Sequence, residues 1–108
     1  MAESLGKELS AALTNITSLI IKTESKSERT TLTKQQAKIA GQLQVFVDKV
    51  VDAALPEYKA ATKALNAANA EAKAAKKELD KIAATIEKFA AAIDKLLALA
   101  VKVATAQL

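Results

Sequence analysis

Apolar residues recur every three or four positions along most of the chain, a spacing that puts them on one face of an α-helix. The longest such pattern covers residues 58–103 and forms two columns in steps of seven. No charged or amide residue interrupts either column: Tyr58, Leu65, Ala72, Leu79, Ile86, Ile93, Ala100 and Ala61, Ala68, Ala75, Ile82, Phe89, Leu96, Val103. The pattern predicts one long helix over about residues 56–107, packed along a stripe against other helices. At 1.5 Å per residue this helix would be about 75–80 Å long.

Two shorter amphipathic helices are predicted before it, over about residues 3–22 and 33–54. Both show steps of three and four between apolar positions. The first stripe is Leu5, Leu9, Ala12, Ile16, Leu19, and the second is Leu32, Gln36, Ile39, Leu43, Phe46, Val50, Ala53. Continuing the first stripe past residue 22 misses the second by one residue, which corresponds to a rotation of about 100°. We therefore expect the helix to stop or distort between them.

The intervening segment, residues 23–31, is rich in Ser, Thr and charged residues, which favour caps and turns. Two capping boxes fit, one starting at Ser25 and one at Thr33, and we favour the second because Leu32 suits a hydrophobic staple. The hydroxyl residues of the break are the candidate hinge: Ser25, Ser27, Thr30 and Thr31.

A chain reversal is predicted at residues 54–56, at the midpoint of the sequence. Proline disfavours helix at the preceding residue and suits the first turn of a new helix, so Pro56 both ends one helix and begins the next. An antiparallel hairpin closing there would place residue i opposite residue 111−i. Under this rule large side chains of the second helix face alanines of the third. The predicted intrachain seam is Leu32, Ile39, Leu43, Phe46, Val50, Ala61, Leu65, Ala68, Ala72 and Leu79.

The predicted fold is all-α, a single helical domain over residues 1–108. Its layout is an elongated antiparallel hairpin in which two shorter helices, end to end, line one long C-terminal helix with coiled-coil-like packing. The alternative folds the first helix back on the second, giving a three-helix bundle at the proline end. That alternative would leave the apolar residues of positions 82–103 uncovered.

The residue supply argues against catalysis. The chain has no Cys and no His, so it lacks the commonest general base, the commonest metal ligand and any thiolate. The sequence has no glycine-rich phosphate loop, and no Glu stands in the core columns, as a di-metal helical bundle would need. We therefore expect no enzymatic activity, no cofactor, no metal and no small-molecule substrate.

The second half of the long helix has more apolar surface than one partner helix covers, which is typical of an interface. We expect the protein to be a scaffold, adaptor or assembly component that self-associates into a helical bundle, most simply a homodimer, or that binds another helical protein. The candidate interface with protein or membrane is Leu13, Ile20, Ile21, Ile86, Phe89, Ile93, Leu96, Leu97, Leu99 and Val103.

A membrane surface is the alternative partner, because residues 86–108 alternate lysines with a broad apolar face. This reading makes the protein a lipid-coating or pore-forming-type component, leaderless and secreted. Nucleic acid is disfavoured: Lys73, Lys76 and Lys77 are interspersed with acidic residues, as on an ordinary solvated helix. No basic leader precedes an apolar run, which favours a cytoplasmic protein and leaves leaderless export open.

Overall fold

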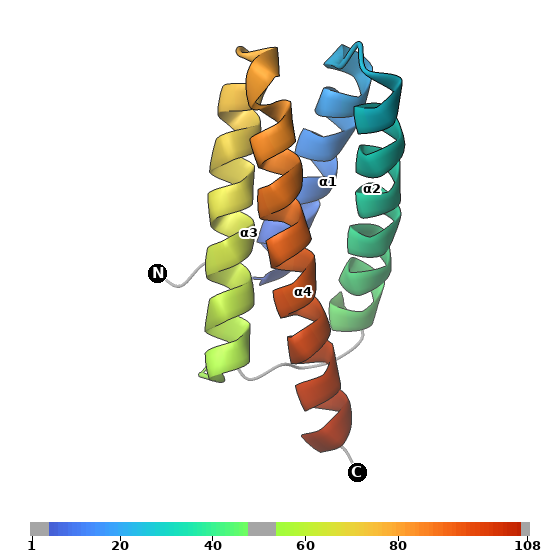
Figure 1. Ribbon diagram of the computed structural model, residues 1–108. Helices are drawn as coiled ribbons and strands as arrows, with labels where there is room; N and C mark the ends of the chain where they lie inside the picture. Colours follow the sequence, from blue (N-terminus) through green and yellow to red (C-terminus); the bar gives the residue numbers. More distant parts are fainter. Residues whose placement is uncertain (1–4, 48–53, 107–108) are drawn as a thin grey trace.

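The computed structural model describes residues 5–47 and 54–106, which form a bundle of four α-helices (Figure 1). The all-α class predicted from the sequence is confirmed. The bounds are Leu5–Lys22 for α1, Lys26–Val47 for α2, Pro56–Ala75 for α3 and Ile82–Ala106 for α4, with a short 3₁₀ helix η1 at Leu79–Lys81.

The helices alternate in direction along the chain and pack as a square (Figure 1). Sequential helices α1 and α2 pack antiparallel, as do α3 and α4. The two hairpins then join through two parallel contacts, α1 with α3 and α2 with α4. The bundle measures 45 × 27 × 18 Å, so the predicted elongated layout is wrong.

The predicted long helix is interrupted between α3 and α4. The amides of Lys77 and Glu78 both donate to Ala74 O, at 3.1 and 2.9 Å, and Glu78 takes an extended backbone before η1 begins. Five of the six residues at positions 76–81 are charged, so the turn remains in contact with water while exposing little apolar surface. Reversal there lets α4 bury against α3 and α2 the apolar side that a straight helix would leave exposed.

The predicted register of the hairpin is also wrong, because α2 and α3 lie across the bundle from each other and are not a packed pair. Most of the predicted seam is nevertheless buried, in a core that all four helices share. Its buried members are Leu32, Ile39, Phe46, Ala61, Leu65, Ala68 and Ala72. Leu43 is half-buried, Leu79 is 42% exposed, and Val50 lies outside the described residues.

The break between α1 and α2 is shorter than predicted, only residues 23–25. Ser25 Oγ accepts a hydrogen bond from Glu28 N at 3.2 Å, so the first capping box begins the helix rather than the second. The hydroxyls of Thr30 and Thr31 donate to carbonyls four residues earlier, at 3.0 and 3.1 Å. Ser27, Thr30 and Thr31 therefore lie inside α2 and form no hinge there.

The predicted reversal at residues 54–56 agrees with the start of α3. Leu55 is an extended N-cap, with φ −61° and ψ 134°, and Pro56 occupies the first turn. The alternative layout was right that α1 folds back on α2. It failed to anticipate that α4 covers its own apolar face by turning back at residues 76–81.

Candidate functional site

Most residues of the predicted interface are buried inside the protein's own core. Phe89, Leu96 and Leu99 are fully enclosed, and Ile93 and Val103 nearly so. Leu13, Ile20 and Ile86 are half-buried against the same core. Among the ten predicted residues only Ile21 and Leu97 are exposed, at 77% and 50%. Most of the predicted interface therefore lies inside the bundle, because α4 packs against α3 and α2 of its own chain.

A smaller apolar surface remains beside the contact between α2 and α4. Leu97 and Val101 lie one turn apart on α4 and are 50% and 66% exposed. Gln35 Nε2 donates to Ile86 O at 2.9 Å, which sets the relative level of these parallel helices. Ten residues beyond Gln35 on α2 is Val45, and ten residues beyond Ile86 on α4 is residue 96, so these two positions lie at about the same level. Val45 is 38% exposed. We call Val45, Leu97 and Val101 the apolar patch.

Among the described residues, the contact between α2 and α4 is the least extensive of the four helix contacts in the square. Two amides of α2 are incompletely paired: within the described part of the chain, the buried Oε1 atoms of Gln35 and Gln42 have no hydrogen-bond partner. Gln35 is 6% exposed. A buried carbonyl oxygen without a donor lowers stability by about 1–3 kcal/mol, so this contact is weaker than its position suggests.

The contact between α1 and α3 is built differently, around polar side chains spaced by seven residues. Glu8, Asn15 and Lys22 follow one another on α1, and Asn69 of α3 is followed by Lys76, the C-cap residue of α3. Glu8, Asn15 and Asn69 are buried, at 8%, 4% and 5% exposed. Because α1 and α3 are parallel, the two polar columns interleave. We call these five residues the polar ladder.

The hydrogen bonds of the polar ladder alternate between the two helices. Asn69 Nδ2 donates to Glu8 O at 3.2 Å and to Glu8 Oε2 at 3.4 Å. Asn15 Nδ2 donates to Asn69 Oδ1 at 3.0 Å, and Lys76 Nζ donates to Asn15 Oδ1 at 2.6 Å. Lys22 Nζ then donates to Lys76 O at 3.4 Å. The ladder thus connects a buried carboxylate to a group of lysines at one end of the bundle.

The far end of the same helix pair is held by Tyr58. Its Oη accepts a hydrogen bond from Leu5 N at 2.9 Å, satisfying one of the amides that the first turn of α1 leaves unpaired. The contact between α1 and α3 is therefore tied at both ends and along its length.

Sequence reasoning missed the polar ladder. The available signal was the seven-residue spacing of polar residues within an apolar helix face, which appears on both helices. Gln36, the one amide in the predicted stripe of the second helix, bonds at the edge of the bundle. Its Nε2 donates to Thr17 Oγ1 of α1 at 2.7 Å.

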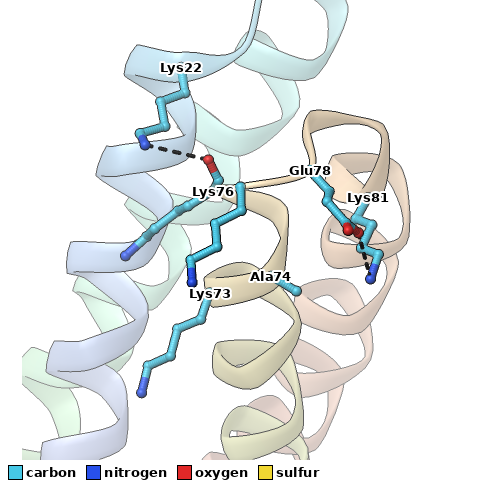
Figure 2. A pocket seen from close by; sticks show the side chains of 7 residues that line it. Lys22, Lys73, Ala74, Lys76, Glu78 and Lys81 are labelled. Carbon is cyan, nitrogen blue, oxygen red and sulfur yellow. Dashed lines mark hydrogen bonds and ion pairs between the residues drawn. The ribbon is translucent and has the colours of Figure 1, made fainter.

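The polar ladder ends at a hollow of about 690 Å³ where α1 and α3 both end. Its lining is Lys22, Lys73, Ala74, Lys76, Lys77, Glu78 and Lys81 (Figure 2). We call it the lysine hollow. Glu78 forms an ion pair with Lys81 at 2.8 Å, and this hydrogen bond and charge raise the pKa of the Lys81 ammonium above its ordinary value. In the sequence, Lys73, Lys76 and Lys77 were identified as a basic cluster but were interpreted as part of a solvated helix surface.

The described residues contain neither a cluster of metal-ligating side chains nor a membrane-spanning helix. Nowhere in ranges 5–47 and 54–106 do three or more acidic side chains gather as a metal site would require. None of the described helices combines the length and apolarity needed to cross a bilayer. No protein-family model, curated protein or solved structure matches the chain.

Proposed function

We propose that this is a non-catalytic helical interaction protein that self-associates through the face formed by α2 and α4. The observation that carries this proposal is the exposure of Leu97 and Val101 on a helix whose other large apolar side chains are buried or half-buried. A single exposed apolar residue is ordinary, but two neighbouring ones, one turn apart on the same helix, are typical of an interface.

A second copy of the same chain is the partner that fits this patch. The C-terminal end of α4 extends past Val47, the last described residue of α2 (Figure 1). A two-fold contact uses the same surface on both copies. Antiparallel contact between two α4 helices places Leu97 of one copy beside Val101 of the other.

Charge favours this antiparallel contact over a parallel one. Exposed Asp94 lies before the apolar pair and exposed Lys102 lies after it. Antiparallel contact brings the acid of each copy toward the lysine of the other, whereas a parallel contact sets like charges together. Opposite charges at the rim of an apolar contact fix its direction more than they add affinity.

Sedimentation equilibrium from low to high micromolar concentration tests the proposal. We expect the native chain to dimerise and Leu97→Lys/Val101→Lys to remain monomeric, because the two lysines of each copy would repel the two of the other. Ala84→Lys/Ala91→Lys is the matched control, since it adds the same charge to exposed positions elsewhere on α4. A native chain that stays monomeric throughout would contradict the proposal, as would a control variant that loses the dimer equally.

The second candidate, a helix that lies on a membrane surface, requires α4 to leave the bundle. The incomplete pairing of Gln35 and Gln42 is the observation that favours it, because it weakens the contact that holds α4 to α2. Co-sedimentation with anionic vesicles distinguishes the two functions. The membrane function is supported if the native chain binds vesicles and forms no dimer, and if Leu97→Lys/Val101→Lys binds the vesicles equally well. Absence of vesicle binding rejects it.

A further inference from the structure

We propose that the lysine hollow binds a small polyvalent phosphate anion, such as pyrophosphate or triphosphate. The hollow lies at the end of the α1–α3 contact, away from the α2–α4 face, so this proposal is independent of self-association. Three steps support it: the charge gathered at the hollow, the ammonium groups that lack counter-ions, and the chemistry of the lining.

The residues that line the hollow carry a charge equal to the net charge of the protein, while Glu71 and Asp80 act on Lys81 from outside the lining. It is lined by five of the sixteen basic residues and by one of the twelve acidic residues, and the chain's net charge is +4. The eleven basic and eleven acidic residues elsewhere balance each other. A positive field concentrated at one concave surface attracts anions and raises their local concentration.

Helix ends account for only part of this cluster. The C-terminal ends of parallel α1 and α3 lie at the same end of the bundle, and cations offset their partial negative charge. Lys22 does so through its bond to Lys76 O. No hydrogen bond or ion pair is found in the described chain for the ammonium groups of Lys73 and Lys77, which leaves their charges unneutralised by protein.

The polar ladder holds one further ammonium group in place. Lys76 Nζ is bonded at 2.6 Å to Asn15 Oδ1, and Asn15 is itself fixed by buried Asn69. Figure 2 shows the side chains of Lys22, Lys73 and Lys76 extending on one side of α3, with the Glu78–Lys81 pair on the other side. The only carboxylate of the lining is thus engaged with its own lysine and lies apart from the three-lysine side.

The lining chemistry selects a phosphate with several charges. Lysine acts on phosphate as a compact point charge, and several ammonium groups at different positions require an anion with several charged oxygens. The lining contains no aromatic ring on which a base could stack and no Arg to make a planar fork. An inorganic polyvalent phosphate fits this composition better than a nucleotide or a single-stranded nucleic acid.

Isothermal titration calorimetry with pyrophosphate and triphosphate, on the full chain at low and at physiological salt, tests the proposal. We expect saturable binding that weakens with salt and is tighter for triphosphate. Lys73→Gln/Lys77→Gln should weaken binding by about tenfold or more, because it removes the two unpaired charges. Lys59→Gln/Lys63→Gln is the matched control, with the same spacing on exposed α3 positions, and should weaken it less than about threefold.

Three results would overturn the proposal. The first is no saturable binding of either phosphate to the native chain. The second is an equal loss of affinity in both variants, which would show that net charge alone is responsible. The third is retention of anionic vesicles or of single-stranded RNA by the native chain when neither free phosphate binds. All four lysines are at exposed positions, so we expect both variants to remain folded. Circular dichroism of both variants checks that their helices are intact.

Discussion

The two parallel helix contacts of this bundle, α1 with α3 and α2 with α4, differ in how they satisfy buried polar groups. Along α1 and α3 the buried amides of Asn15 and Asn69 donate and accept within one continuous network. Along α2 and α4 the buried oxygens of Gln35 and Gln42 have no partner in the described chain. Two contacts of the same direction in one small bundle therefore differ in how completely their buried amides are paired.

This difference shows what a buried polar residue does in a helix pair. A satisfied network fixes the axial register, because a shift by one turn would separate every donor from its acceptor. An incompletely satisfied amide lowers the stability of a helix contact and fixes its axial register less firmly than a satisfied network does. We expect α1 and α3 to form the rigid side of the bundle and α2 and α4 the adjustable side.

The two proposed interactions follow the same division. The polar ladder ends in the lysine hollow, where fixed ammonium groups suit a small anion. The apolar patch borders the looser contact, where a partner helix can add packing that α2 and α4 lack. Each surface is thus placed by the contact beside it.

The largest expected effect compares the apolar cores of the two sides. Leu65 of α3 is fully buried, whereas Leu43 of α2 is half-buried. Leu65→Ala should lower the free energy of unfolding by about 3 kcal/mol, since it removes burial and leaves a cavity. Leu43→Ala should lower it by about 1 kcal/mol, because much of that side chain is already in water. Urea unfolding followed by circular dichroism measures both, and equal losses would contradict the division into two sides.

A middle-sized effect tests the polar ladder itself. Asn69→Leu should lower the free energy of unfolding by about 2–3 kcal/mol, because Asn15 Nδ2 and the Glu8 carboxylate lose their partner inside the protein. Asn15→Leu/Asn69→Leu should cost at least about 1 kcal/mol less than the sum of the single variants, since the pair shares one bond. Strictly additive losses would show that the bond between the two amides contributes nothing.

The smallest expected change in the free energy of unfolding is for Gln35, the buried amide in the contact between α2 and α4. Gln35→Leu loses the bond to Ile86 O but removes a buried unpaired oxygen, so its free energy of unfolding should stay within about 0.5 kcal/mol of the native value. Urea unfolding beside Asn69→Leu provides the comparison. A loss for Gln35→Leu as large as that for Asn69→Leu would remove the distinction between the two contacts.

Local signals predicted the parts of the fold that local chemistry decides. The helix predicted over about residues 3–22 corresponds to α1 at Leu5–Lys22, and the start of α3 followed from Pro56. The turn at residues 76–81 was not predicted, because it contains neither Gly nor Pro and the seven-residue columns continue through it. Thr30 and Thr31 were predicted to lie in a break between helices. Their hydroxyls instead bond to carbonyls within α2, so the helix continues through them.

The candidate sites were predicted only in part. Leu97 and the lysines at positions 73, 76 and 77 were visible as an apolar flank and a basic cluster. Lys22 joins that cluster only because α1 runs parallel to α3, and Asn15 reaches Asn69 across 54 residues of sequence for the same reason. Contacts between parallel helices of different hairpins leave no local mark that gives their register.

The sequence by itself determined that this protein is helical and which face of each helix is apolar, because spacing and propensity act within a few residues. Only the tertiary structure decided which helix covers which face. A seven-residue apolar column packs equally well against its own chain or another, and an extended hairpin satisfies the same spacing as a bundle. The bundle prevails because turning at residues 76–81 brings Phe89, Leu96 and Leu99 out of water within one chain. What that burial leaves outside, Leu97 and Val101, is the surface proposed to meet a second copy.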